Sequence, residues 1–107
     1  MVINQYDIFW VDLNPTVGHE IKKVRPCVVI SPDEMNLNID TVIIAPMTTR
    51  SRNYPTRTKI DFEEKTGWIV LDQLRAIDKI RLKEKAGYLR EVEIIKVKKI
   101  LKEILVD

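Results

Sequence analysis

The stretch YDIFWVDLNPTVGHEIKKVRPCVVIS (residues 6–31) decides the fold, because two strand-like runs flank one loop. Residues 6–13 are rich in aromatic and β-branched side chains and end at Asn-Pro, which predicts a strand entering a turn. Residues 27–31 form a continuous apolar run, which is typical of a central strand buried on both faces. The loop between the two runs ends at Arg25-Pro26, so the stretch predicts two paired strands joined by a polar loop.

The spacing of apolar residues changes near the C-terminus. Ile94, Val97, Leu101 and Ile104 recur at three- and four-residue steps, which predicts an amphipathic helix over residues 91–106. No Ser, Thr, Asp or Asn directly precedes this helix, so the sequence identifies no N-cap.

Between these two regions lie further short runs. Strands are predicted at residues 41–49, 56–62 and 68–74, with a short sixth one at 75–78 and one helical turn at 33–36. Short strands in hairpin order followed by a terminal helix predict the α+β class, as a small antiparallel β-sheet or barrel with a C-terminal α-helix. One helix covers only part of such a sheet, so we expect a homodimer to bury the rest.

Length and composition fit one soluble domain spanning residues 1–107. Apolar residues make up 45% of the chain and charged residues 32%, and no apolar run approaches the roughly 20 residues of a membrane helix. The N-terminal segment carries Asp7 and Asp12 and lacks the pattern of a secretory signal, so a cytoplasmic location is expected. Cys27 is the single cysteine, and its apolar surroundings predict a buried structural thiol.

Charge is unevenly distributed along the chain. Residues 48–60 contain four basic side chains and no acidic one. Such a loop suits contact with phosphate groups, and it equally suits a solvated surface loop; composition leaves both interpretations open.

The motifs of most enzyme classes are absent from the sequence. There is no glycine-rich phosphate loop, no H-E-x-x-H zinc motif and no G-x-S-x-G nucleophile element, and the carboxylates are scattered. We therefore expect neither a metal nor another cofactor. The remaining chemistry is the kind that one arginine, one histidine or glutamate and one hydroxyl can perform.

RNA cleavage fits this small set of groups, because RNA supplies its own nucleophile in the 2′-hydroxyl. His19 can give or accept a proton near neutral pH, and the guanidinium of Arg25 can stabilise a crowded phosphorane. Thr48 or Thr49 offers a hydroxyl donor to a phosphate oxygen. The same residues also fit a histidine without a role, an Arg25–Glu20 surface ion pair and ordinary strand threonines. Their types alone therefore do not distinguish a catalytic site from these alternatives.

Three segments together resemble the MazF/PemK family of toxin–antitoxin endoribonucleases: DIFWVDLNPTVGHEIKKVRPCVVISPDEMN, VIIAPMTT and GWIVLDQLRAID. The resemblance runs from Tyr6 to the C-terminal helix, in the order and spacing of the family. It implies a homodimer of small CcdB-like barrels that cuts single-stranded mRNA at a short sequence without a metal, leaving a 2′,3′-cyclic phosphate and a 5′-hydroxyl. It also implies a MazE-like antitoxin as protein partner.

The resemblance assigns roles to particular residues. The catalytic arginine of the family falls on Arg25 and the catalytic threonine on Thr48, with Glu20 and His19 as candidates for the proton steps. The loop that carries them would form one wall of an RNA groove, and residues 50–57 the opposite wall, with Tyr54 placed to stack a base. The expected RNA-binding residues are Lys22, Lys23, Thr49, Arg50, Arg52, Tyr54, Arg57, Asp72 and Gln73.

Two departures from the family pattern stand out. PemK-type members have an arginine where this chain has Val70, so the acid role given to that arginine has no counterpart and the chain resembles the MazF branch. Many relatives have a glycine where this chain has Lys23, which predicts a stiffer loop. Two other classes stay open: a CcdB-like protein that poisons DNA gyrase without catalysis, and a module that binds RNA or a peptide without cutting it.

Overall fold

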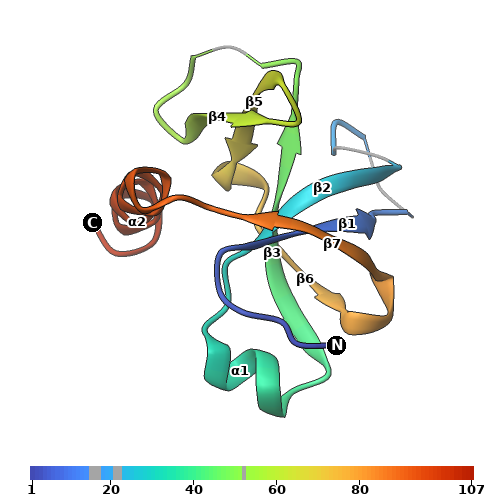
Figure 1. The fold of residues 1–107 in the computed structure, drawn as a ribbon. Coiled ribbons are helices and arrows are strands. Elements are labelled where there is room, and N and C mark those ends of the chain that lie inside the picture. Colours follow the sequence, from blue (N-terminus) through green and yellow to red (C-terminus); the bar gives the residue numbers. More distant parts are fainter. Residues whose placement is uncertain (15–17, 21–22, 52) are drawn as a thin grey trace.

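The structure, a computed structural model, describes residues 1–14, 18–20, 23–51 and 53–107. The described residues form a curled antiparallel sheet with helices at its margins (Figure 1). The strands are β1 (Asp7–Asp12), β2 (Val24–Val29), β3 (Thr41–Thr48), β4 (Arg57–Phe62), β5 (Lys65–Val70), β6 (Arg75–Asp78) and β7 (Leu82–Tyr88). The helices are α1 (Asp33–Asn38) and α2 (Glu91–Leu105), with short 3₁₀ turns η1 (Leu71–Gln73) and η2 (Lys79–Arg81).

The strands follow the order β4-β5-β3-β2-β1-β7, with β6 beside the first half of β3. Every strand pair is antiparallel. The sheet curls into a half-barrel, so the predicted class of a small antiparallel sheet or barrel with a C-terminal helix is confirmed. The order places β2 and β3 at the centre, where the apolar runs of the sequence are longest.

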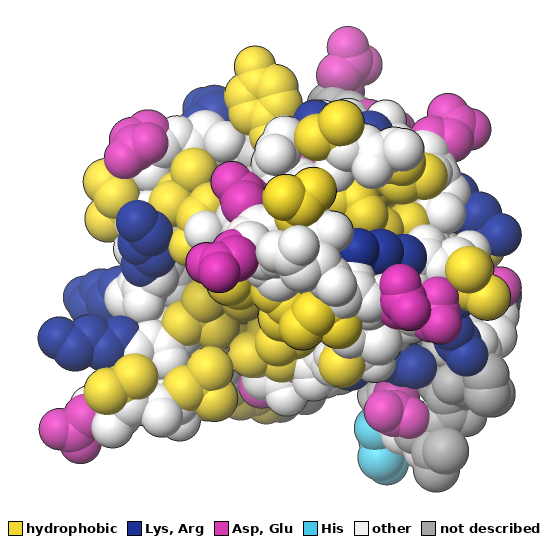
Figure 2. Space-filling model, turned by 90° about the horizontal axis from the view of Figure 1, so that it is seen from below, with side chains coloured by type: hydrophobic (Ala, Val, Ile, Leu, Met, Phe, Trp, Pro, Cys, Tyr) yellow, Lys and Arg dark blue, Asp and Glu magenta, His cyan; other side chains and the backbone are white. Residues whose placement is uncertain are grey.

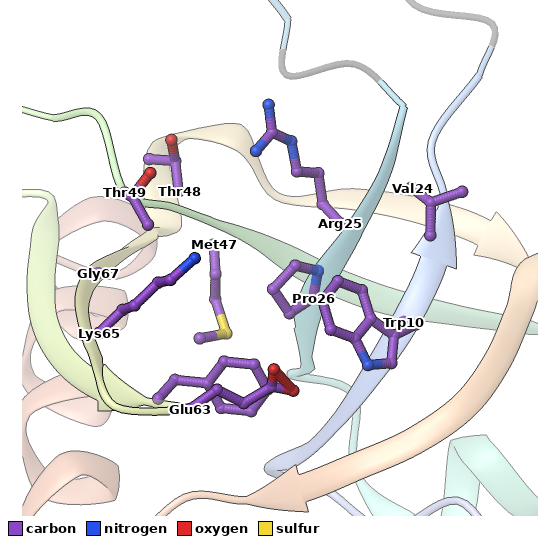
Figure 3. Close-up of a pocket in the computed structure, with 11 residues that line it drawn as sticks. Trp10, Val24, Arg25, Pro26, Met47, Thr48, Thr49, Glu63, Lys65 and Gly67 are labelled. Atoms are coloured by element: carbon purple, nitrogen blue, oxygen red, sulfur yellow. The ribbon is translucent and has the colours of Figure 1, made fainter.

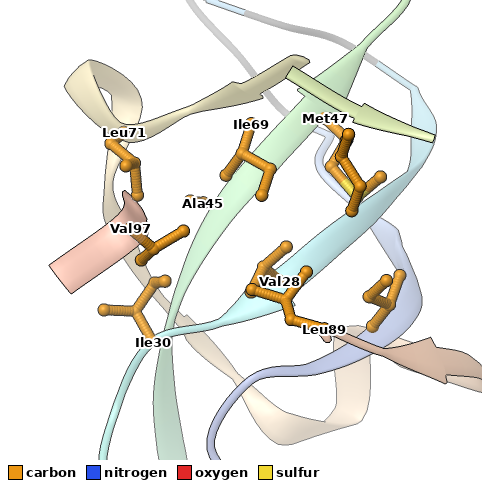
Figure 4. Packing of buried hydrophobic residues seen from close by; sticks show 10 residues of the cluster. Val28, Ile30, Ala45, Met47, Ile69, Leu71, Leu89 and Val97 are labelled. Atoms are coloured by element: carbon orange, nitrogen blue, oxygen red, sulfur yellow. The ribbon is translucent and has the colours of Figure 1, made fainter. Parts of the chain in front are cut away.

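Side chains of the central strands bury both faces of the sheet. Ile8 of β1 lies opposite Val28 of β2, and both belong to an apolar cluster that also contains Ile69 and Val97 (Figure 4). Phe9 lies opposite Cys27, and these face a second cluster on the other side. Alternating residues of one strand thus enter different clusters, which explains why residues 27–29 are apolar without interruption.

Cys27 lies fully inside the second cluster. Burial raises the pKa of its thiol to about 12, against a smaller opposing effect from Arg75. A thiol with such a pKa stays protonated at neutral pH and is a poor nucleophile. The prediction of a buried structural cysteine is confirmed.

The sequence located some strand boundaries incorrectly. β2 begins at Val24 rather than Cys27, because Arg25 and Pro26 pair with β1 despite the proline. β5 covers Lys65–Val70 and not residues 68–74, since the chain turns into η1 after Val70. The sequence missed β7 entirely, because this edge strand buries few of its side chains and shows no apolar alternation.

Helix α2 begins at Glu91, as predicted, but with a capping contact that the sequence did not identify. The backbone N–H of Arg90 donates to the Glu93 carboxylate at 2.8 Å, and the Arg90 guanidinium donates to its other oxygen at 3.0 Å. A capping contact from the third helical residue thus replaces the usual Ser, Thr, Asp or Asn. Within the described part of the chain, no helix combines the length and apolar character needed to cross a membrane.

Val97 provides a test of how α2 is held on the sheet. It is fully buried in the cluster between α2 and the sheet, whereas Ile95 on the same helix is 59% exposed. We expect Val97→Ala to lower the free energy of unfolding by about 2 kcal/mol, since it removes buried methyl groups and leaves a cavity. Ile95→Ala should change it by less than about 0.5 kcal/mol in the same urea titration. Equal effects of the two substitutions would contradict this packing.

Candidate active site

A cleft opens where β3 leaves β2 and joins β5. The pairing of β2 with β3 ends at Cys27↔Pro46, and the next two residues, Met47 and Thr48, pair only with β5, the neighbour of β3 opposite β2 in the sheet order. Proline has no N–H to donate, so Pro26 and Pro46 do not support a longer ladder between β2 and β3. The strands therefore separate at this point and leave a cleft of about 260 Å³.

The place where β2 and β3 separate, called the fork below, brings Arg25 and Thr48 together. Continuing the antiparallel register by two residues from Cys27↔Pro46 brings Arg25 level with Thr48, on the same face of the two strands. Both side chains line the cleft, and Thr49 lines it beside them (Figure 3). The fold thus brings together the arginine and the threonines that the sequence singled out. Arg25 lies near the start of β2, and Thr48 and Thr49 lie at the end of β3 and just after it.

The other walls of the cleft come from residues that the sequence did not single out. Apolar lining is supplied by Trp10, Val24, Pro26, Met47, Phe62 and Gly67, and charged lining by Glu63 and Lys65 of the β4–β5 hairpin. A side chain at position 67 would place its Cβ 3.2 Å from the Thr48 carbonyl oxygen, so glycine lets β5 approach β3 closely at the cleft.

The Thr48 hydroxyl is oriented by the chain that follows it. Its Oγ1 accepts a hydrogen bond from the backbone N–H of Arg50 at 3.1 Å and lies 3.4 Å from the Arg50 carbonyl oxygen. The second contact is long for a hydroxyl donor, so a phosphate oxygen in the cleft can compete for the hydroxyl proton. Thr49 has an exposed side chain beside it.

The expected proton carriers lie outside this cleft. Glu20 lines a neighbouring pocket of about 270 Å³ together with Asp72, Gln73 and Arg75. His19 is exposed and lines neither of these pockets. The two pockets adjoin along β3, because Pro46 lines the second and Thr48 the first, roughly 7 Å apart along one strand.

Two arginines that the sequence analysis did not identify hold the base of the β1–β2 loop. Arg75 donates to the Leu13 carbonyl oxygen at 3.2 Å, and Arg81 donates to the carbonyl oxygens of Asp12, at 3.4 Å, and of Asn14. The Leu13 N–H also donates to the carbonyl oxygen of Lys23 at 3.1 Å, which closes the loop. No local signal in the sequence marks these contacts, since they join residues more than 60 positions apart.

Lys23 adopts a left-handed backbone conformation, with φ of +71°. This conformation disfavours a residue with a side chain and favours glycine, so Lys23 is held against the local backbone preference. Lys23 is exposed, as an RNA-contacting residue must be. Lys22, also expected to bind RNA, lies outside the described residues.

The basic loop that follows β3 carries less uncompensated charge than its sequence suggests. The Arg57 guanidinium forms an ion pair with Asp72 at 3.1 Å, donates to the Ser51 hydroxyl at 2.9 Å and lies 5.2 Å from the centre of the Tyr54 ring. Arg57 and Tyr54, both expected to contact RNA, thus form one network. Arg50 is exposed beside it, and Arg52 lies outside the described residues.

Asp72 connects this network to the second pocket. Burial raises the pKa of Asp72, but hydrogen bonds from Arg57 and Thr56 outweigh this effect, so the pKa lies below its ordinary value. The same hydrogen bond raises the pKa of Arg57. As for a metal centre, no three His, Cys, Asp or Glu side chains of the described residues lie close enough together to hold an ion.

The left-handed backbone of Lys23 predicts that substitution by glycine increases the stability of the protein. We expect Lys23→Gly to raise the free energy of unfolding by up to about 1 kcal/mol, because it removes the left-handed strain at the cost of some chain entropy. Lys83→Gly in β7 is the matched control and should destabilise by about 0.5–1 kcal/mol, since Lys83 is not in the left-handed region and glycine relieves no strain there. Urea denaturation measures both, and a loss of stability in Lys23→Gly would contradict the argument.

The lowered pKa of Asp72 predicts a pH-dependent contribution to stability. This contribution is present above the pKa of about 3.9 of an unfolded aspartate and is lost as the pH falls through the lower folded value. Asp72→Asn should therefore reduce the free energy of unfolding at pH 7, by less than about 1 kcal/mol because the pair is partly exposed. The difference from wild type should shrink towards pH 2. Glu84→Gln, at an exposed residue of β7, should show no such trend.

Comparison with known proteins agrees with the fold. The family model of PemK-like, MazF-like toxins of type II toxin–antitoxin systems matches residues 4–105. A curated relative, endoribonuclease MazF of Staphylococcus epidermidis, is 37% identical over 102 residues, which cover 90% of this chain and 85% of the relative.

Solved structures give the same picture of the fold. MazF from Deinococcus radiodurans superimposes with a TM-score of 0.86 at 24% identity, covering 98% of this chain and 97% of that one. A mycobacterial endoribonuclease in complex with its cognate antitoxin gives 0.82 at 19% identity, covering 96% and 94%. With nearly the whole chain matched by the family model, this chain belongs to the PemK-like, MazF-like toxins of type II toxin–antitoxin systems.

Proposed function

We propose that this toxin cuts single-stranded mRNA by attack of a 2′-hydroxyl on the adjacent phosphodiester, without a metal, leaving a 2′,3′-cyclic phosphate and a 5′-hydroxyl. The enzyme class predicted from the sequence, an endoribonuclease of the MazF type, is confirmed at the level of the family. The observation that carries the mechanism is that Arg25 and Thr48 line one cleft at the fork between β2 and β3.

Arg25 stabilises the charge that develops on the phosphate. Attack of the 2′-hydroxyl gives a dianionic phosphorane, and a planar guanidinium can donate to two of its oxygens at once. Arg25 lies near the start of β2, where Pro26 and the pairing with β1 limit backbone movement. A group fixed in this way needs little reorganisation as the charge builds up.

Thr48 orients the phosphate through its hydroxyl. The hydrogen bond from the Arg50 N–H fixes the position of Oγ1, and the hydroxyl proton then points to an oxygen of the bound phosphate. Thr49, which lines the same cleft, offers a second hydroxyl for the RNA backbone.

Glu20 is the better placed candidate for the proton steps. It lines the pocket that adjoins the cleft along β3, whereas His19 lines neither pocket. An RNA strand that crosses from one pocket to the other passes Arg25 and Thr48 and brings its 2′-hydroxyl towards Glu20. In this role Glu20 removes the proton from the 2′-hydroxyl as general base while the O2′–P bond forms. The P–O5′ bond then breaks, and the 5′-oxygen leaves as a hydroxyl with a proton taken from water. Asp72 and Gln73, in the same pocket, contact the neighbouring nucleotide.

The protein acts as a homodimer of this one domain and is held inactive by a MazE-like antitoxin. Structures of related toxins from Deinococcus radiodurans and mycobacteria are complexes with an antitoxin, which supports such a partner here. Apolar side chains gather in the middle of the face seen in Figure 2, with charged ones around them, and Leu37 and Ile39 are exposed at α1 and just after it. Apolar surface of this kind supports burial against a second copy. We expect the toxin to act in the cytoplasm, where its proposed mRNA substrate occurs.

The test is cleavage of a long RNA by the purified protein in excess EDTA, with the RNA ends mapped by sequencing. The wild-type protein should cut at discrete sites. Arg25→Ala should lower the rate at least about 100-fold, because an oxyanion-stabilising donor is lost. Thr48→Ala should lower it about 10-fold, in line with loss of one neutral hydrogen bond. Lys98→Ala, which removes an exposed cation from α2, should keep the wild-type rate.

Other outcomes identify the rival classes. Tight RNA binding without cleavage would indicate a binding module, and intact RNA with trapped gyrase–DNA complexes in treated cells would indicate a gyrase poison. Full activity of Arg25→Ala would contradict the proposed mechanism even if the wild-type protein cuts RNA.

A further inference from the structure

The β4–β5 hairpin directs an acidic side chain into the cleft by means of a strained turn. Phe62 pairs with Lys65, so the turn has two central residues, Glu63 and Glu64. Their φ angles are +48° and +63°, both in the left-handed region that such turns normally fill with Asn and Gly. Side chains at both positions therefore oppose the local backbone preference, and strain that persists next to a cleft suggests a function.

The two glutamates of the turn differ in where they lie. Glu63 lines the cleft together with Lys65, whereas Glu64 does not. Figure 3 shows the Glu63 carboxylate on the side of Pro26 and Trp10, across the cleft from Thr48 and Thr49. Among the described residues, Glu63 has no hydrogen-bond or ion-pair partner, so its two oxygens can accept from a ligand.

The floor beside Glu63 suits a flat aromatic ligand. The rings of Trp10 and Phe62 lie 6.3 Å apart and are tilted by 58°, and both side chains are only half-buried. Pro26 and Met47 complete this apolar part of the cleft. A volume of about 260 Å³ lies below the roughly 300–1,000 Å³ of sites for drug-sized ligands, so the space suits one nucleobase.

A carboxylate is an unexpected group in a site for a polyanion. It repels the phosphates held by Arg25 and Thr48, and a neutral residue in its place would favour RNA binding in general. Lys65, which lines the same cleft, offsets part of this repulsion, and hydrogen bonds donated by the RNA to the carboxylate offset the rest. The donors of RNA, apart from its hydroxyls, are the ring N–H and exocyclic amino groups of the bases.

We propose, on the basis of the RNA cleavage inferred above, that Glu63 determines the base recognised next to the cut. The base stacks against the tilted Trp10–Phe62 pair and presents its Watson–Crick edge to the Glu63 carboxylate. Guanine fits best, because its ring N–H and its exocyclic amine are two parallel donors for two carboxylate oxygens. Uracil fits worst, because its single N–H stands between two carbonyl groups that the carboxylate repels.

The experiment compares the cleavage sites of the full-length wild-type protein and three variants, on a random-sequence RNA pool with sequenced ends. Wild type should favour guanine over uracil at a nucleotide flanking the cut, roughly 5- to 150-fold. Glu63→Gln keeps the size of the side chain but replaces one acceptor by a donor, and it should abolish this preference. Glu64→Gln, in the same turn but outside the cleft, should leave the preference unchanged.

A third variant separates base reading from mere damage to the hairpin. Glu63→Asn should raise the melting temperature, because asparagine tolerates the left-handed backbone, yet should still lose the preference, because its side chain is shorter and carries no charge. An unchanged site preference in both Glu63 variants, or no guanine enrichment in wild type, would overturn the inference while the cleavage activity stands. A wild-type protein that cuts no RNA would overturn the proposed function, and this inference with it.

Discussion

The end of the β2–β3 pairing at Pro46 is the constraint on which the candidate site depends. The first half of β3 pairs with β6, residues 44–46 pair with β2, and the last two residues pair with β5. A continuous ladder from β2 to β3 would close the space between Arg25 and Thr48. Two prolines without N–H donors, and a glycine that lets β5 come close, favour the fork instead. The cleft is therefore a product of backbone hydrogen bonding rather than of side-chain placement.

The two-sided core gives this fork a rigid base. β2 is buried on both faces at Cys27, Val28 and Val29, directly beyond the residues that line the cleft. Rotation of β2 would move side chains out of both apolar clusters at once, which costs far more than a surface rearrangement. Arg25 thus extends from the most constrained strand of the molecule, which is what charge stabilisation in a transition state requires.

The sequence predicted the central part of the fold but not its margins. Residues 27–29 and 41–48 are recognisable because burial on both faces demands apolar, β-branched side chains in an unbroken run. β7 gives no such signal, since Lys83, Glu84 and Lys85 face solvent at the edge of the sheet.

Only part of the candidate site could be predicted from the sequence. Arg25 and Thr48 could be assigned because a local motif surrounds each of them. Glu63, Trp10 and Arg75 could not, because their relation to the site arises from contacts between residues distant in the chain. Asp72 was expected to contact RNA, but its ion pair with Arg57 could not be read from residues 15 positions apart.

The two arginines beneath the β1–β2 loop have a consequence for how such a protein can diversify. Arg75 and Arg81 bind the loop through main-chain oxygens of residues 12–14, and every amino acid supplies those oxygens. Substitutions within the loop can therefore alter what it contacts while its anchorage persists. Main-chain anchorage of this kind allows new binding preferences to arise by substitution in the loop while the sheet beneath it keeps its fold.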